Sequence, residues 1–543
     1  MNGPWRCSCL RLLVKTACVG ALPMSLAVFS GWASAYDYRS DDGDLAISLG
    51  NTVRYTLGWR AQDASSSIAN NFVYAQSDRK FDKGDVVTNR VDLLTELNLN
   101  YQEMWGARVS AATWYDNAYH DDSVNTPAGM TGSYVGNRYS SSVDRYYNGP
   151  SGEILDAFVL GRFDVGFPLD VRLGRMTNYW GENYFNGNSA ISYSQSPVDG
   201  RKALSNPGIE TKEVFMPVGQ LSAKAQVADS LSLAMQYYLE WRPSRVPAPG
   251  TFLGPADMLP NDIDQFPQFG FPVVDPKEPS NRGNWGVSAR WNVPNLDWTL
   301  GFYYRQFDDY NAWTNVQTIG GVPAALRAVY PEDVQLYGVS LAANGPWGSA
   351  LGAEVSYRKN DALALNDTFT LDGDKGPRGN TWHALANTTW LLGTTPLWES
   401  GTLVTELAYS RLDKVTSHPE LFKGEGYASC AGQDKSTGCA TRDTWATSVS
   451  FTPAWLQVVP GIDIEMPTSI NYGLHGNGAS NSRLAYEGAY TWTAGINVKY
   501  HIHTDITLAY NGYHADREGD SSGNGGFSLN DRDWVSLTVK TSF

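Results

Sequence analysis

The C-terminal segment DRDWVSLTVKTSF repeats its apolar side chains at every second position. Val535, Leu537 and Val539 share one face with the terminal Phe543, whereas the positions between them are mainly polar. A period of two is that of a β-strand with one apolar face and one solvated face. The segment therefore predicts a strand, either at the edge of a soluble sheet or in a sheet that crosses a membrane.

The same period of two recurs along the whole chain. Near the N-terminus, Val53, Tyr55, Leu57 and Trp59 alternate with polar residues and a glycine. Counting the C-terminal segment, about eighteen strands are expected. The others cover residues 45–60, 93–101, 105–115, 155–163, 169–176, 211–226, 230–242, 285–293, 296–307, 334–343, 347–358, 382–392, 402–412, 445–457, 462–473, 490–500 and 505–513.

The connections between these strands alternate between short turns and long polar loops. PN at 294–295, NGP at 344–346 and VPG at 459–461 are examples of the short turns. This asymmetry is typical of outer-membrane barrels, in which an even strand number leaves both termini in the periplasm. Closure is expected because an open strand edge in hydrocarbon leaves backbone groups unpaired. We therefore predict an all-β fold, a single transmembrane barrel of about 18 antiparallel strands over residues 36–543.

Residues 1–35 have the organisation of a secretory signal peptide. Arg6, Arg11 and Lys15 precede an apolar stretch, and the segment closes on ASA at 33–35. This order of positive, apolar and small residues predicts export and cleavage after Ala35. Beyond it, no apolar run is long enough for a membrane-spanning helix. The expected location is the outer membrane of a Gram-negative bacterium.

The charge of the chain argues against a nucleic-acid partner. The sequence has 41 basic and 56 acidic residues, a net charge of −15. Proteins that bind nucleic acid concentrate lysine and arginine on one face instead. The expected partners are outer-membrane lipid, lipopolysaccharide and the barrel-assembly machinery, for which a strand that ends on phenylalanine resembles the recognition signal.

Two cysteines follow the signal segment. Cys430 and Cys439 lie nine positions apart in a polar, glycine-rich loop. A disulfide is expected because exported proteins pass through oxidising compartments. Metal binding is the weaker interpretation, since two cysteines alone do not complete a site.

The sequence contains no recognisable catalytic, cofactor or metal motif. G-x-S-x-G, H-E-x-x-H, phosphate-binding and EF-hand patterns are all missing. His501 and His503 lie two positions apart on one strand face, but two ligands do not make a closed metal site. We therefore predict a protein without cofactor or enzyme activity. A hydrolase with serine, histidine and aspartate on distant strands remains the alternative.

Charged residues of the polar strand faces are expected to line the lumen of the barrel. Their signs are mixed, so no selectivity ring of a single sign is predicted. For each of them the alternative is a structural role in holding the wall together. The predicted lumen charges are Arg54, Asp92, Glu96, Arg108, Glu240, Arg290, Arg305, Glu354, Arg358, Glu406 and Lys499.

Two of the expected outer loops are long enough to fold into the mouth of the barrel. One covers residues 177–210, and the other covers residues 243–282 and is rich in proline. Long loops are often functional, whereas proline-rich ones are more often disordered. The first loop is expected to constrict the lumen or gate a ligand, and the second is a further candidate for that role.

The stretch DVRLGRMTNYWGENYF resembles the signature of a large, mostly uncharacterised family of proteobacterial outer-membrane proteins that bears only a domain-of-unknown-function label. YPEDVQLYGVSL, GAEVSYR, PGIDIEMPTSINYGLHG and DRDWVSLTVKTSF match it as well, so the resemblance covers nearly the whole chain after the signal segment. It implies a barrel encoded near a companion envelope factor and an inner-membrane permease, often beside the catabolism of lipids, sterols or terpenoids.

A few residues of this signature are candidates for a specific role. Structural alternatives exist for two of them, since Gly181 fits a left-handed turn and Trp180 is suited to packing the loop against the wall. The candidates are Gly174, Arg175, Trp180, Gly181, Glu182, Pro197 and Asp199.

The resemblance suggests a channel that passes hydrophobic or amphiphilic small molecules, such as lipids, sterols or terpenoids. The alternative is a substrate-selective, water-filled porin for small polar solutes, which the mixed lumen charges favour. An outer-membrane lipid hydrolase is the third hypothesis and belongs to a different functional class.

Overall fold

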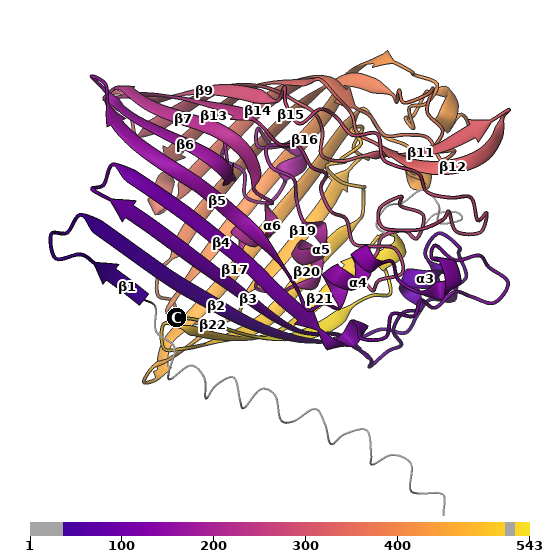
Figure 1. Ribbon diagram of the computed structural model, residues 1–543, viewed down its shortest axis with the longest axis horizontal. Coiled ribbons are helices and arrows are strands. Elements are labelled where there is room, and N and C mark those ends of the chain that lie inside the picture. Colours follow the sequence, from indigo (N-terminus) through magenta and orange to yellow (C-terminus); the bar gives the residue numbers. More distant parts are fainter. Residues whose placement is uncertain (1–35, 516–526) are drawn as a thin grey trace, which may run out of the picture.

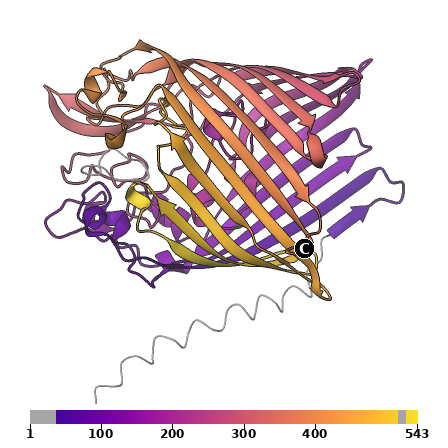
Figure 2. The ribbon, with the colours of Figure 1, turned by 180° about the vertical axis from the view of Figure 1, so that it is seen from behind.

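The computed structural model describes residues 36–515 and 527–543 (Figure 1). The expected signal segment, residues 1–35, lies outside the described residues. The wall is a closed barrel of 18 antiparallel strands, as predicted, if β18 and β19 are taken as two halves of one strand. Figure 2 shows the orange to yellow strands of the C-terminal part, which form the wall opposite the indigo and purple strands.

The wall strands follow one another in chain order, each paired with its neighbour. They are β2 (Leu45–Arg60), β3 (Val86–Tyr101), β4 (Trp105–Asp116), β5 (Ser151–Asp164), β6 (Pro168–Met176), β7 (Val218–Ala228), β8 (Leu231–Tyr238), β9 (Trp285–Val293), β10 (Trp298–Phe307), β13 (Val334–Asn344), β14 (Ala350–Ala362), β15 (Arg378–Leu392), β16 (Ser400–Ser417), β17 (Asp443–Val459), β18 (Ile462–Glu465), β19 (Thr468–His475), β20 (Tyr490–Tyr500), β21 (Thr504–His514) and β22 (Trp534–Ser542).

Smaller elements lie at the ends of the wall or in the loops. β1 (Tyr36–Arg39) pairs with the start of β2, and β11 (Trp313–Ile319) and β12 (Val322–Val329) form a separate hairpin in an outer loop. The helices are α2 (Ser66–Ala69), α3 (Ala75–Asp78), α4 (Ser141–Tyr147), α5 (Gly200–Ser205) and α6 (Thr211–Val214). Short 3₁₀ turns cover Asn117–Tyr119, Val135–Asn137, Gly187–Ser189, Pro346–Gly348, Ala428–Cys430, Lys435–Thr437 and Phe527–Leu529.

The C-terminal strand closes the barrel. β22 pairs with β2 in a register that sets Leu537 opposite Leu57, and β2 pairs with β3 on its other side. At the end of the seam, Phe543 and Asn51 exchange backbone hydrogen bonds of 2.9 and 2.7 Å. Because the last strand finds its partner in the first wall strand, neither edge of the sheet is left open.

Alternation along the strands separates an apolar outer face from a buried inner face. Phe302, Val339 and Val355 lie side by side on β10, β13 and β14 and are about half exposed in the absence of lipid. Their neighbours Ser340 and Glu354 face inward and are buried. The outer face is the apolar band that a bilayer requires. The chain is an outer-membrane β-barrel.

The outer band predicts a strong dependence on charge at one position. Val339→Arg is expected to destabilise the barrel by about 2–4 kcal/mol, because the charge meets hydrocarbon. Urea unfolding of the protein refolded in lipid vesicles measures the effect. Trp347→Arg is the matched control, since Trp347 lies in the turn between β13 and β14 and is 89% exposed. Equal stability of the two variants would refute the orientation of β13.

Four predicted strand boundaries were wrong. β3 starts at Val86 rather than at residue 93, and β8 ends at Tyr238 rather than at residue 242. Trp347 has a positive φ in a turn, so β14 begins only at Ala350. Residues 211–217 form α6 and a short connection before β7, because the side chains of Glu210 and Glu213 cap the first turn of a helix there.

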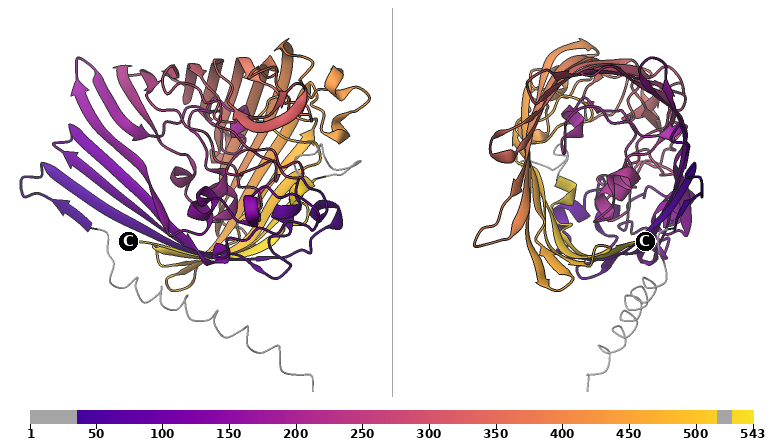
Figure 3. Two further views of the ribbon diagram at one scale, coloured as in Figure 1. Left: turned by 45° about the vertical axis from the view of Figure 1, so that its right-hand side comes forward. Right: turned by 90° about the vertical axis from the view of Figure 1, so that its left-hand side faces the viewer.

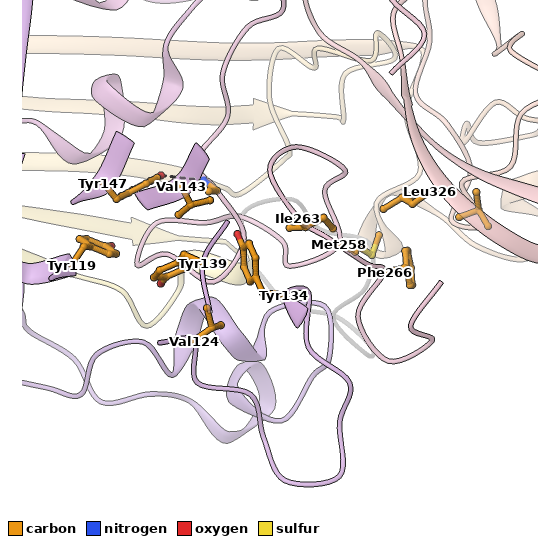
Figure 4. Close-up of a cluster of buried hydrophobic side chains, with 12 residues drawn as sticks. Tyr119, Val124, Tyr134, Tyr139, Val143, Tyr147, Met258, Ile263, Phe266 and Leu326 are labelled. Atoms are coloured by element: carbon orange, nitrogen blue, oxygen red, sulfur yellow. Dashed lines mark hydrogen bonds between the residues drawn. The ribbon is translucent and has the colours of Figure 1, made fainter. Parts of the chain in front are cut away.

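The outer loops pack into an extracellular cap. Its apolar core joins aromatic residues of the loop 117–150 to Met258 and Phe266 of the proline-rich loop and to Leu326 of β12 (Figure 4). Tyr134 and Tyr139 donate hydrogen bonds to the carbonyls of Pro249 and Gly250 at 2.7 and 2.6 Å. The proline-rich loop is therefore ordered by packing and hydrogen bonding across the mouth.

The predicted disulfide is present. Cys430 and Cys439 are bonded and buried in the loop between β16 and β17. Replacing both with serine is expected to destabilise this loop by about 2–3 kcal/mol, since the free loop gains conformational entropy. Limited proteolysis of the folded protein checks this as faster cleavage within residues 418–442, while the barrel keeps its heat-modifiable migration on gels. Unchanged cleavage would assign the bond no local stabilising role.

Candidate functional site

The connection between β6 and β7 crosses the interior of the barrel. This connection, residues 177–217, is called the plug segment below; it includes α5 and α6. Seen along the barrel, helical turns of this purple to magenta part of the chain lie within the ring of strands (Figure 3). Its hydrogen bonds reach wall residues from β2 to β16. The loop 177–210, expected to constrict the lumen, thus lies inside it.

A carboxylate of β14 binds the backbone of the plug segment. Glu354, 2% exposed, accepts hydrogen bonds from the N–H groups of Glu182, Asn183 (3.0 Å) and Ile191 (2.7 Å). Gly181 has a φ of +105°, and a Cβ at this position would collide with the Glu354 carboxylate. A glycine is needed here both for the backbone conformation and for this close approach.

A second carboxylate, on β16, holds the next part of the plug segment. Glu406, 1% exposed, accepts hydrogen bonds from the backbone N–H groups of Tyr184 (2.7 Å), Phe185 (3.2 Å) and Asn186 (2.6 Å). The side-chain amide of Asn186 donates to it as well, at 2.9 Å. Consecutive backbone N–H groups aimed at one carboxylate form an anion-binding concavity, and such charge-assisted bonds are stronger than neutral ones.

Two buried arginines bind carbonyl groups of the same segment. Arg305 of β10 donates to the carbonyls of Ile191 (2.9 Å), Tyr193 (2.6 Å) and Ser194 (2.7 Å). It has no carboxylate partner among the described residues, and 1% of it is exposed. The plug carbonyls therefore solvate a cation that water does not reach.

The other arginine, Arg358 of β14, donates to the carbonyls of Asn188 (2.9 Å) and Ala190 (3.1 Å). Its guanidinium carbon lies 3.9 Å from the centre of the Tyr193 ring. A cation over an aromatic face adds to the attraction. On the same part of the plug segment, Glu182 forms an ion pair of 3.0 Å with Arg290 of β9.

The second half of the plug segment is held by ion pairs to the wall near the barrel seam. Arg54 of β2 pairs with Glu213 of α6 at 3.0 Å and lies 3.6 Å from Asp92. Lys212 pairs with Glu96 of β3 at 2.5 Å. Arg108 pairs with Glu96 and, at 3.0 Å, with Asp156. Each predicted lumen charge on β2, β3 and β4 therefore has an oppositely charged partner.

The remaining signature residues shape the plug segment. Trp180 packs on the cluster of Ile191 and Tyr193, and its backbone N–H donates to the side chain of Gln195 at 2.8 Å. Asp199 caps α5 and pairs with Arg245 at 2.7 Å. The carbonyl of Pro197 accepts a hydrogen bond of 2.8 Å from the N–H of Met216, which joins the two ends of the segment.

Two residues lie on the outer side of the wall. Arg175 shares a face of β6 with Leu173, which is 49% exposed, and it pairs with Glu240 at 2.6 Å. The prediction that Glu240 lines the lumen was wrong, because the backbone N–H groups of Leu239 and Glu240 both donate to the carbonyl of Gly219. Two residues opposite one form a bulge, which ends the alternation.

A grouping of serine, histidine and aspartate does occur in the lumen. Ser480 donates directly to Asp361 at 2.7 Å, and His383 lies 2.9 Å from Thr381 and 3.9 Å from Asp361. In a hydrolase the histidine stands between the serine and the acid. Here Ser480 contacts the acid instead, and all three residues of the grouping are buried. No group of three or more metal-ligating side chains occurs among the described residues.

Sequence reasoning did not identify the partners of the buried lumen charges. The period of two places Glu354, Glu406, Arg305 and Arg358 on inner faces, but their partners are backbone groups of the plug segment. Backbone N–H and C=O groups occur in every loop, so no side-chain pattern marks them. The glycine at position 181 is the one sequence signal that belongs to this contact.

Comparison with solved structures finds outer-membrane channels of low sequence identity. OccK1 (OpdK) of Pseudomonas aeruginosa is 10% identical with a TM-score of 0.43, covering 92% of this chain and 98% of its own. OccAB1 of Acinetobacter baumannii is 11% identical with a TM-score of 0.44, covering 94% and 98%. The outer membrane channel DcaP of Acinetobacter baumannii is 11% identical with a TM-score of 0.37, covering 93% and 99%.

No curated protein matches the chain. No described helix is long and apolar enough to cross a membrane. A family model described as "Protein of unknown function (DUF1302)" matches residues 16–543. The protein is a channel-like outer-membrane barrel with an internal plug, and the chain belongs to the DUF1302 family.

Proposed function

We propose that this barrel passes hydrophobic or amphiphilic small molecules across the outer membrane, with the plug segment as its gate. The observation that carries the proposal is an apolar cluster inside the lumen. Tyr303 and Phe307 of β10 and Val334 and Leu336 of β13 point inward and pack against the plug residue Ile191. Water-filled barrels have polar interiors instead.

A second apolar cluster lies on the inner side of the opposite strands. Leu94, Ala112, Trp114 and Leu155 pack together on β3, β4 and β5, all at most 4% exposed. Apolar side chains on two parts of the inner wall offer an alkyl chain or a fused ring system a surface to follow. Such a surface lowers the cost of taking an apolar solute through the barrel.

The proposal also explains why the gate is tied so firmly. A lumen that admits amphiphiles also admits detergents and apolar antibiotics when it is open. The plug segment is held by buried carboxylates and guanidinium groups, which cannot remain unpaired away from water. A substrate that opens the gate must therefore offer these groups, or the plug, substitute contacts.

Single-channel recording in a planar bilayer tests the proposal. The refolded protein is expected to show a small conductance in salt alone, because the plug segment occupies the lumen. Low concentrations of a long-chain amphiphile are expected to change the current by a factor of about two or more through displacement of the plug. The matched control is a polar solute of similar mass. A large, steady current that ignores amphiphiles would contradict the proposal.

A water-filled porin for polar solutes is the second candidate. Arg172 of β6 and Lys224 of β7 face the lumen, are exposed, and have no ion-pair partner among the described residues. Free cations near the periplasmic end suit small anions. In the same recordings, strong anion selectivity with block by small carboxylates would favour the porin.

A further inference from the structure

A pocket of about 320 Å³ lies in the lumen beside the plug segment. Its walls come from the inner side of β17 to β21, from the loop between β19 and β20, and from Asn186 of the plug segment. Ligand sites in proteins have volumes of about 300–1,000 Å³, so this pocket fits a small ligand. No contact described for the buried charges of the plug uses this space.

The pocket is mostly apolar. Leu484, Tyr486, Tyr513 and Leu529 contribute to its lining, together with four alanine and glycine positions of β17, β19 and the loop. A few amide and hydroxyl groups, such as those of Asn471 and Thr491, are interspersed. An apolar wall with few polar groups is the usual composition of a small-molecule site.

One cation faces this pocket, and no carboxylate does. Arg483 is the only described lining residue with a formal charge at neutral pH, in a chain whose net charge is −15. Its guanidinium donates one hydrogen bond, to the carbonyl of Gly478 at 2.8 Å, and lies 5.0 Å from the centre of the Tyr486 ring. It forms no ion pair with a described residue, in contrast to Arg54, Arg108 and Arg290. Its remaining donors can therefore bind a ligand.

We propose that this pocket binds an anionic amphiphile, with Arg483 holding the carboxylate or sulfate head and the apolar wall holding the tail. A planar guanidinium matches the two oxygens of such a head group. The inference rests on the proposed function and adds to it the charge of the substrate class.

The same pocket touches the gate. Asn186, which lines it, donates to Glu406 at 2.9 Å and to Ser448 at 3.2 Å. Asn188 donates its side-chain amide to the carbonyl of Arg483 at 2.8 Å. A ligand that moves Arg483 or competes for Asn186 thus acts on the contacts that hold the plug segment. Occupancy of the pocket is linked in this way to release of the plug.

The loop that carries Arg483 also borders a second pocket, on the extracellular side. This outer pocket, of about 230 Å³, is lined by Asn481 and Ser482 and by residues of the cap such as Tyr310 and Tyr330. Consecutive residues of one loop therefore face the two spaces. An amphiphile entering from outside meets the outer pocket first and reaches the inner one by displacing residues 481–484.

The test compares three single-chain amphiphiles on the full-length protein in planar bilayers: laurate, dodecyltrimethylammonium and dodecanol. Laurate is expected to change the current at a concentration at least tenfold lower than the other two. Arg483→Gln is expected to raise the laurate concentration for half effect at least tenfold, and Arg483→Lys to restore part of it. Arg172→Gln, which removes a lumen cation outside the pocket, is the matched control. Binding of radiolabelled laurate to nanodiscs provides a second readout.

The outcomes separate the two proposals. If all three amphiphiles act alike and Arg483→Gln changes nothing, recognition of an anionic head is refuted, whereas the proposed passage of amphiphiles stands. If none of them changes the current or binds, both proposals fail. If Arg172→Gln weakens laurate as much as Arg483→Gln does, the effect comes from lumen charge in general, and the assignment of the site is refuted.

Discussion

Replacing residues 182–195 with a short Gly-Ser linker is expected to raise the single-channel conductance about tenfold, because the bore then loses the segment that crosses it. The wall strands should still assemble, since their pairing in register does not involve the plug segment. Conductance in 1 M KCl and uptake of a bulky antibiotic by cells measure the effect. The folded fraction is read from heat-modifiable migration on gels.

The control for this deletion is the same linker inserted into the turn at residues 393–399, outside the lumen. That variant should conduct like the parent. An unchanged current in the deletion variant, with a folded barrel, would mean that the plug segment does not limit passage. The gating role would then be lost, while the architecture of the wall would be unaffected.

The double variant Glu354→Ala, Glu406→Ala is expected to free the plug segment without shortening it. Each carboxylate binds three consecutive or nearby backbone N–H groups, and hydrogen bonds to charged groups contribute about 1.5–3 kcal/mol each. Loss of both anchors should weaken docking of the segment by on the order of 5 kcal/mol. That corresponds to roughly a thousandfold larger undocked population. Frequent opening events should replace the quiet closed state.

Glu465→Ala is the matched control for this variant. Glu465 is a lumen carboxylate that pairs with Lys499 at 2.7 Å and bonds Asn497, without a described contact to the plug segment. Removing it should leave the opening frequency unchanged. Glu354→Gln with Glu406→Gln keeps the oxygen acceptors without the charge, so an intermediate frequency is expected. If the alanine and glutamine pairs both remain closed, the carboxylates are not the anchors of the gate.

The wall could be predicted from the sequence, because a strand that faces lipid on one side must alternate. Val339 and Glu354 show this directly, since each lies on the face that its position in the period of two assigns. The prediction failed where a local hydrogen bond overrides the period. At Glu240 a bulge ends the alternation, and at 211–217 a capped helical turn replaces the expected strand. Both depend on geometry that hydrophobicity does not encode.

The function of the lumen charges was less accessible. Arg305 and Arg358 were expected in the lumen, but as charges that a solute would meet, or as wall residues. In the structure both are buried against plug carbonyls that lie more than 110 residues away in the sequence. Only the tertiary arrangement brings these groups together. The pocket at Arg483 is equally invisible in the sequence, since its walls come from four strands and two loops.

The anchoring of the plug segment also constrains the order of assembly. Glu182 and its acceptor Glu354 are separated by 172 positions, and Tyr184 and Glu406 by 222. Strands β14 and β16 must therefore be in place before the segment between β6 and β7 has anything to dock on. Contacts of such long sequence separation form late. A half-built barrel would thus be an unplugged one, and docking of the segment would mark the point at which the wall has become large enough to enclose it.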